Sequence, residues 1–203
     1  MESKKGTTTV GVVAKDCVVL ASEAKATLGY LISSKEARKI YKIDDRIAVA
    51  ISGSVGDSQQ LIRVIKAEVE LYKHENKEAT VNAVATLLAN ILHSTRHFPL
   101  LTMLILGGVD KRGCHLYNID VTGGMTEDKY TACGSGSPMA FGVLERGYRE
   151  NMRAEDAVEL AIESIKAAVE RDVFSGGRKI DVAVITESGV EFSRHEIGPK
   201  LSE

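Results

Sequence analysis

The chain has 203 residues, of which 44% are hydrophobic and 27% are charged. This length supports a full hydrophobic core, and this balance excludes disordered, collagen-like and coiled-coil chains. With 26 basic and 28 acidic side chains the net charge is −2, which is no general signature of nucleic-acid or membrane binding.

Neither the N-terminal residues nor the cysteines indicate export. The opening MESKKG is polar and lacks the apolar core of a secretory signal. No apolar run approaches the roughly 18 residues of a membrane span. Cys17, Cys114 and Cys133 form no CxxC pair, so neither a disulfide framework nor a zinc ribbon is supported. A reducing, cytoplasmic setting fits best.

The first quarter of the chain is rich in β-branched residues and predicts strands. The predicted strands cover residues 8–14, 17–21, 28–33, 40–43 and 46–52. Lys15 and Asp16 are the expected loop of a hairpin between the first two strands. Asp44 and Asp45 are the expected turn between the last two.

The rest of the chain alternates between helical and strand patterns. Helices are predicted over 57–74, 81–97, 138–148 and 154–173, and Thr80 is a candidate N-cap for the second. Strands are predicted over 101–106, 115–119, 129–133, 180–186 and 190–194. Helix pairs inserted between blocks of strands predict an α+β fold, a four-layer α/β/β/α sandwich of antiparallel sheets.

Two motifs that suggest a ligand are better explained otherwise. His93 and His97 are spaced to share a helix face, but Ser94 follows His93, so the HExxH pattern of zinc enzymes is absent. We interpret them as exposed helical histidines. The glycine-rich residues 134–142 match neither phosphate-loop pattern, and Pro138 favours a turn that enters a helix. We expect no metal and no cofactor.

One further pattern concerns the threonines that follow Gly6. Thr7, Thr8 and Thr9 open the first strand, and β-propensity alone explains such a run. Five other segments change the interpretation: SEAKATLG at 22–29, SKEARKIYKID at 34–44, AISGSVGD at 50–57, GSGSP at 134–138 and RDVFSGG at 171–177. Together they resemble the archaeal type of proteasome β subunit, a family of N-terminal-nucleophile hydrolases. The resemblance covers the chain from Gly6 onward and implies the same four-layer sandwich.

The resemblance also implies roles for individual residues. Residues 1–6 match a propeptide that is removed by self-cleavage at Gly6–Thr7, which leaves residues 7–203 as one peptidase domain with Thr7 as nucleophile. The other catalytic positions that match the family are Glu23, Lys39, the oxyanion-hole glycine Gly53, and the supporting residues Ser135, Asp172 and Ser175. Glu23 stands where Asp is more frequent, and Lys25 where Arg is common. Neither change removes a charge, so both are interpreted as tolerated.

Elementary chemistry explains why these residue types are needed. A threonine hydroxyl requires an adjacent base, and an α-amino group with a pKa of about 7.7–8.0 supplies one on the same residue. Inside a chain that nitrogen is an amide without basicity, so the bond after Gly6 must break first. Lys39 would lower the pKa of the Thr7 amine and hydroxyl, and Glu23 would keep the Lys39 ammonium charged. Taken singly, Glu23 and Lys39 could be a surface ion pair and Gly53 a plain turn.

Substrate preference and partners follow from the resemblance alone. The positions that match the substrate pocket are Ala26, Thr27, Ala37, Ile51 and Val55. An uncharged pocket gives no partner to a buried ionic side chain, which predicts a chymotrypsin-like preference for hydrophobic residues. The family assembles β subunits, identical or mixed, into rings of seven that stack between α rings as α7β7β7α7. Regulatory ATPase rings feed it unfolded protein; neither nucleic acid nor a membrane takes part.

Two other functions must be weighed against that of a catalytic proteasome β subunit. A non-catalytic ring subunit would lose the nucleophile or the lysine, whereas Thr7, Glu23, Lys39 and Gly53 are all present. The bacterial two-component relative generally carries its nucleophile directly after the initiator methionine. The six residues before Thr7 disfavour that reading. The mass of the mature chain discriminates between these possibilities, because loss of MESKKG supports the catalytic subunit.

Overall fold

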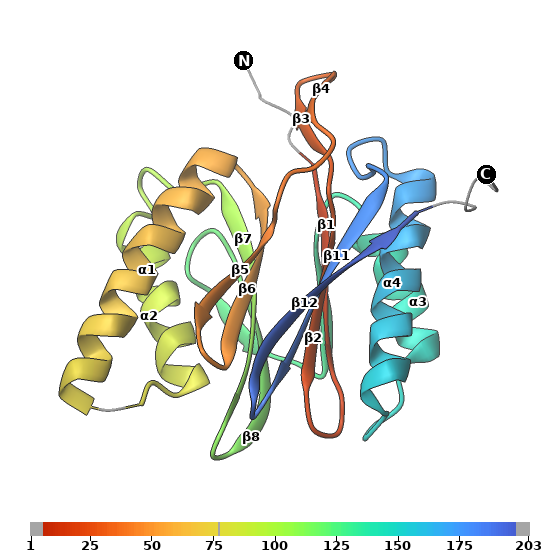
Figure 1. The fold of residues 1–203 in the computed structure, drawn as a ribbon. Helices are drawn as coiled ribbons and strands as arrows, with labels where there is room; N and C mark the ends of the chain where they lie inside the picture. Colours follow the sequence, from red (N-terminus) through yellow and green to blue (C-terminus); the bar gives the residue numbers. More distant parts are fainter. Residues whose placement is uncertain (1–5, 77, 198–203) are drawn as a thin grey trace.

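Two five-stranded antiparallel sheets face each other, and a pair of helices covers the outer face of each sheet (Figure 1). This computed structural model describes residues 6–76 and 78–197, with only the backbone described at residue 76. The predicted α+β sandwich in four layers is confirmed. Residues 1–5 of the predicted propeptide lie outside the described residues.

The first sheet joins strands from both ends of the chain in the order β10-β1-β2-β11-β12. Its strands are β1 (Thr8–Val13), β2 (Val18–Glu23), β10 (Tyr130–Gly134), β11 (Lys179–Thr186) and β12 (Gly189–Glu196). The helices on its outer face are α3 (Ser137–Gly147) and α4 (Ala154–Arg171). Every residue of β1 and β2 is buried, because these strands have helices on one face and the second sheet on the other.

The second sheet has its strands in chain order, β5-β6-β7-β8-β9. They are β5 (Ile40–Asp44), β6 (Ile47–Gly53), β7 (Thr102–Asp110), β8 (Gly113–Ile119) and β9 (Met125–Glu127). Helices α1 (Val55–Asn76) and α2 (Val81–Ser94) cover its outer face. The predicted cap is confirmed, since Thr80 Oγ1 accepts a hydrogen bond from the Ala83 N–H at 3.2 Å.

Hydrophobic side chains fill all three spaces between the layers. Leu20 and Ile105 lie between the two sheets. Leu61 and Leu88 belong to the core between the second sheet and its helices. Ile165 belongs to the core between the first sheet and α3 and α4. The sheets are therefore held in fixed relation, which matters because the candidate site draws residues from both.

The structure corrects two predictions about secondary structure. The single strand expected over 28–33 is a hairpin of β3 (Ala26–Leu28) and β4 (Leu31–Ser34), which turns at Gly29 with φ of 61°. Helix α2 ends at Ser94, so His97 lies beyond it and shares no helix face with His93. The Thr95 N–H bonds to the Leu92 carbonyl at 3.2 Å, a tighter turn that ends the helix.

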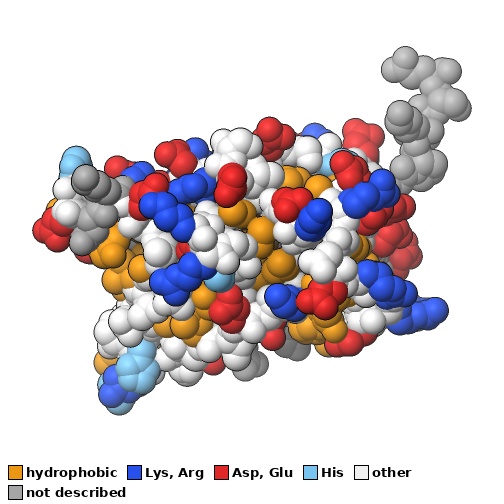
Figure 2. Space-filling model, turned by 90° about the horizontal axis from the view of Figure 1, so that it is seen from below, with side chains coloured by type: hydrophobic (Ala, Val, Ile, Leu, Met, Phe, Trp, Pro, Cys, Tyr) orange, Lys and Arg blue, Asp and Glu red, His pale blue; other side chains and the backbone are white. Residues whose placement is uncertain are grey.

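The two ends of the sandwich differ. The β3–β4 hairpin projects at the end where β1 begins (Figure 1). The opposite end, seen in Figure 2, carries basic and acidic side chains interspersed with hydrophobic ones. Ion pairs there include Lys42 with Asp45 and Lys73 with Asp44. Within the described part of the chain, none of the helices has the length and hydropathy to cross a membrane.

Candidate active site

The start of β1, the end of β2 and the segment before β5 bring three polar side chains together. Thr7 directly precedes β1, Glu23 ends β2 and Lys39 directly precedes β5. Pairing of β1 with β2 sets Thr9 opposite Ser22, which brings the start of one strand beside the end of the other. Thr7 and Lys39 are each 6% exposed, and Glu23 is fully buried.

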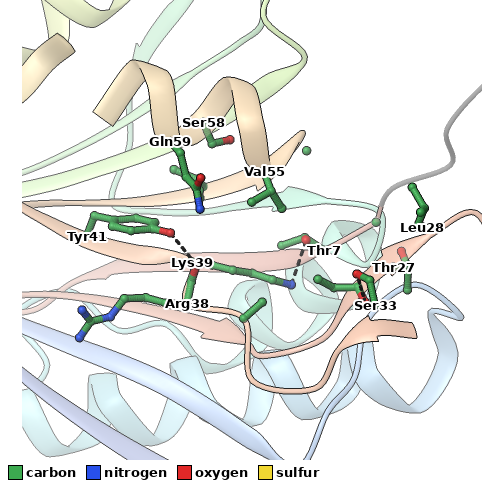
Figure 3. Close-up of a pocket in the computed structure, with 15 residues that line it drawn as sticks. Thr7, Thr27, Leu28, Ser33, Arg38, Lys39, Tyr41, Val55, Ser58 and Gln59 are labelled. Carbon is green, nitrogen blue, oxygen red and sulfur yellow. Dashed lines mark hydrogen bonds between the residues drawn. The ribbon is translucent and has the colours of Figure 1, made fainter. Parts of the chain in front are cut away.

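The Lys39 ammonium has a hydrogen-bond acceptor for each of its three protons. Its Nζ donates to Thr7 Oγ1 at 2.9 Å, to the Lys25 carbonyl oxygen at 2.6 Å, and to the Glu23 carboxylate. Figure 3 shows the Lys39 side chain extending to Thr7. A fully satisfied ammonium is fixed in orientation, and here it is directed at the threonine hydroxyl.

The Glu23 carboxylate is held by backbone groups as well as by Lys39. Its Oε2 accepts from the N–H groups of Lys25 at 2.7 Å and Gly176 at 3.2 Å, and its Oε1 accepts from the Thr8 N–H at 3.3 Å. Burial raises the pKa of Glu23, and Lys39 and the N–H groups of Lys25 and Gly176 oppose the rise. Burial likewise lowers the pKa of Lys39, and the Glu23 charge opposes that change. The two charges therefore sustain each other in a buried site.

A second polar cluster lies behind Thr7. Ser175 Oγ donates to Asp172 Oδ2 at 2.6 Å, and the Thr8 hydroxyl lies 2.6 Å from the same serine oxygen. Ser135 Oγ donates to Asp172 Oδ2 at 2.5 Å and lies 3.5 Å from the Thr7 carbonyl oxygen. The structure thus brings the three supporting residues named from the sequence into one network beside the Thr7 backbone.

Two glycines allow close backbone approaches at the site. Gly53, at the end of β6, has φ of 115°, and a Cβ there would overlap the Leu101 carbonyl oxygen. Gly134, at the end of β10, has φ of 95°, and a Cβ there would overlap the Thr7 carbonyl oxygen. Gly53 lines the same cavity as Thr7. Sequence reasoning missed Gly134, and its place in the GSGSP segment was the available signal.

A cavity of about 410 Å³ opens beside Thr7 and Lys39 (Figure 3). All five positions expected in the substrate pocket line it: Ala26, Thr27, Ala37, Ile51 and Val55. Further lining residues, which sequence reasoning missed, are Leu28, Ser33, Arg38, Tyr41, Ser58 and Gln59. The Tyr41 hydroxyl donates to the Arg38 carbonyl oxygen at 2.9 Å. The cavity wall therefore combines apolar side chains with hydroxyl, amide and cationic side chains.

The regular spacing of side chains along strands and helices could have predicted some of these additional cavity residues. Side chains alternate along an extended segment, so Tyr41 lies on the same side as Ala37 and Lys39. On α1, Ser58 and Gln59 follow Val55 by three and four positions, which places all three on one helix face. In Figure 3, Val55 and Gln59 project from α1 toward the cavity.

Comparison with known proteins assigns the family. Residues 3–185 match the family model described as "Proteasome subunit". The chain belongs to the proteasome subunit family. It is 51% identical over 207 residues to "Proteasome subunit beta" of Methanocaldococcus fervens, covering 100% of this chain and 92% of that protein. It is 55% identical over 196 residues to the protein of that name from Ferroglobus placidus, covering 95% and 93%. The resemblance to archaeal proteasome β subunits is confirmed.

Proposed function

We propose that this proteasome family chain is a catalytic β subunit, a threonine endopeptidase that activates itself by cleaving Gly6–Thr7. The observation that carries the proposal is the 2.9 Å hydrogen bond from the buried Lys39 ammonium to Thr7 Oγ1, beside a cavity. A merely structural threonine has no need of a fully paired, buried lysine, because burial of a charge is costly.

Self-cleavage would use the hydroxyl of Thr7 on its own preceding carbonyl. Thr7 Oγ1 adds to the carbonyl carbon of Gly6 and gives up its proton. The bond from that carbon to the Thr7 nitrogen then breaks as the nitrogen takes up this proton, directly or through water. The product is an ester between Gly6 and Thr7 Oγ1, which water hydrolyses to a Gly6 carboxylate and the free hydroxyl. The step leaves Thr7 with an α-amino group.

Peptide hydrolysis would then use that amine as the general base. The amine takes the proton of the hydroxyl, directly or through water, as Oγ1 attacks the substrate carbonyl. Lys39 stabilises the negative charge that develops on Oγ1. The Gly53 N–H is the proposed donor to the tetrahedral oxyanion, and loss of such a donor costs about 100- to 1000-fold in rate. The substrate C–N bond then breaks as the Thr7 ammonium returns its proton to the leaving nitrogen, which releases the amine product and leaves an acyl ester on Oγ1. Water hydrolyses this ester to the acid product and the free Thr7 hydroxyl.

The cavity supports a preference for hydrophobic side chains. Ala26, Ala37, Ile51 and Val55 contribute apolar surface to the cavity, so a charged side chain packed against these four residues would lose its hydration without gaining a partner from them. We place the subunit in a ring of seven β subunits, identical or mixed. Two such rings stack between rings of α subunits, and a regulatory ATPase ring supplies unfolded protein.

Substitution of the nucleophile tests the proposal. Thr7→Ala should retain residues 1–6 and abolish peptidase activity, because it removes the attacking oxygen from both reactions. Thr9→Ala is the matched control, because Thr9 is a buried threonine of β1 whose Oγ1 has no hydrogen-bond partner among the residues that the structure describes. Chain mass and hydrolysis of a fluorogenic peptide with a hydrophobic residue before the scissile bond are the readouts. Normal turnover by Thr7→Ala would refute the mechanism.

A further inference from the structure

The residue before the proposed cleavage point, Gly6, lies where neighbouring atoms leave no room for a side chain of its own. Gly6 is buried, and a Cβ built on it would overlap the Cβ of Phe174. The same Cβ would lie 2.7 Å from Phe174 Cγ and 2.5 Å from Ser135 Oγ. Real Cβ atoms do not approach other heavy atoms so closely, so a side chain at position 6 requires Phe174 or the Gly6 backbone to move.

The segment that carries Phe174 is anchored at each residue from 173 to 176. The Val173 carbonyl accepts from Lys25 Nζ at 2.9 Å, and the Phe174 N–H donates to Asp172 Oδ1 at 3.2 Å. Ser175 Oγ donates to Asp172 Oδ2, and the Gly176 carbonyl accepts from the Lys25 N–H at 3.1 Å. Phe174 therefore cannot withdraw without breaking bonds that also hold the candidate catalytic cluster.

From this packing we propose that Phe174 is a positioning residue for self-cleavage, and that it restricts position 6 to glycine. The inference rests on the proposed function, since it concerns the same Gly6–Thr7 bond. Contact with Phe174 fixes the plane of the Gly6 carbonyl relative to Thr7 Oγ1. A methyl group at position 6 displaces that carbonyl, and a displacement near 1 Å at a reacting atom costs about 100-fold in rate.

The test follows leader removal in full-length chains by intact mass after a pulse of expression. Gly6→Ala should slow removal by about 100-fold. The second substitution Phe174→Gly deletes the overlapping Cβ and should recover at least tenfold of that loss. Phe174→Ala keeps the Cβ and is the matched control, so it should recover less than twofold. Residue 6 leaves with the propeptide, so these effects arise before the mature site exists.

Folding is checked separately. Each variant is also produced with residues 1–6 replaced by a segment that an added protease removes directly before Thr7. Peptide hydrolysis above the Thr7→Ala background then shows that the variant has folded. If Phe174→Gly does not fold, Gly6→Ala still tests the restriction at position 6, because it leaves the mature chain unchanged. Slowed removal supports that restriction, and removal at the wild-type rate overturns the whole inference.

The outcomes separate this inference from the proposed function. If the unsubstituted chain never loses residues 1–6, the proposed self-cleavage is wrong. If it does lose them, but Gly6→Ala is processed equally fast, Phe174 imposes no restriction. Equal recovery by Phe174→Gly and Phe174→Ala, with both variants folded, would also overturn the role given to Phe174.

Discussion

At the scale of single residues, the orientation of Lys39 depends partly on a backbone carbonyl, a group that the type of residue does not reveal. Two of its acceptors, Thr7 Oγ1 and Glu23, were predicted from the sequence. The third is the backbone carbonyl of Lys25 at 2.6 Å. Every residue carries such a carbonyl, so no sequence pattern could have identified it. It matters because it completes the set of acceptors that holds the ammonium against the hydroxyl.

Removal of the Lys39 side chain should therefore abolish function without unfolding the chain. We expect Lys39→Ala to lower kcat/KM by at least about 100-fold and to leave residues 1–6 attached, since both reactions need the cation. Lys42→Ala is the matched control, because Lys42 lies three residues further along and pairs with Asp45 at the surface. Steady-state hydrolysis and chain mass check both variants. Strong hydrolysis by Lys39→Ala would mean that another group supplies the charge.

At the scale of elements, the ends of strands position the site, and their exact geometry was only partly predictable. The alternation of apolar residues predicted β5 and β6 and their turn, which carry Lys39 and Gly53 to the cavity. The β3–β4 hairpin was predicted as one strand because Gly29 is the only strong turn residue in its middle. The close approach of β10 to Thr7 also went unpredicted, since strand pairing between distant segments leaves no local signal.

The approach of β10 gives a test at this scale. Gly134→Ala should destabilise the fold and reduce peptidase activity strongly, because its Cβ would overlap the Thr7 carbonyl oxygen. Gly113→Ala is the matched control for Gly134→Ala, since Gly113 has a similar φ of 118° but open space where a Cβ would stand. Both variants carry the backbone strain of about 1 kcal/mol, and only the first carries the overlap. Thermal unfolding and hydrolysis are the readouts; equal losses would show that the overlap is harmless.

At the scale of the whole molecule, the order of strands and helices predicted the layers but not which strands are neighbours. Strand β2 pairs with β11, about 160 residues later in the chain, at the centre of the first sheet. Most residues of both strands are apolar, so many partners would have satisfied their burial equally well. Packing of the two sheets selects one arrangement. The layers also bury two cysteines, which are 2% and 1% exposed: Cys17 between the first sheet and its helices, and Cys133 between the two sheets.

This burial predicts how stability depends on pH. Burial raises the pKa of the Cys17 thiol to about 11 and that of Cys133 to about 12, against an ordinary value near 9. Above pH 9 the unfolded chain loses these protons before the folded chain does. These two thiols should therefore lower the free energy of unfolding as the pH rises from about 9 to 11.

Urea unfolding at pH 8.5 and 10.5 measures this effect. The variant with both Cys17→Ala and Cys133→Ala should lose less stability between these two pH values than the unsubstituted chain. An identical loss in the two chains would show that the thiols ionise as readily in the folded state as in the unfolded state.

The most direct test of the account is the mass of the chain taken from particles that are hydrolysing peptide. The central claim is that Thr7 hydrolyses peptide substrates only after the bond to Gly6 has broken and its nitrogen has become an amine. We predict a chain that begins at Thr7, shorter by residues 1–6. A fully active particle whose chains still carry those six residues would contradict it.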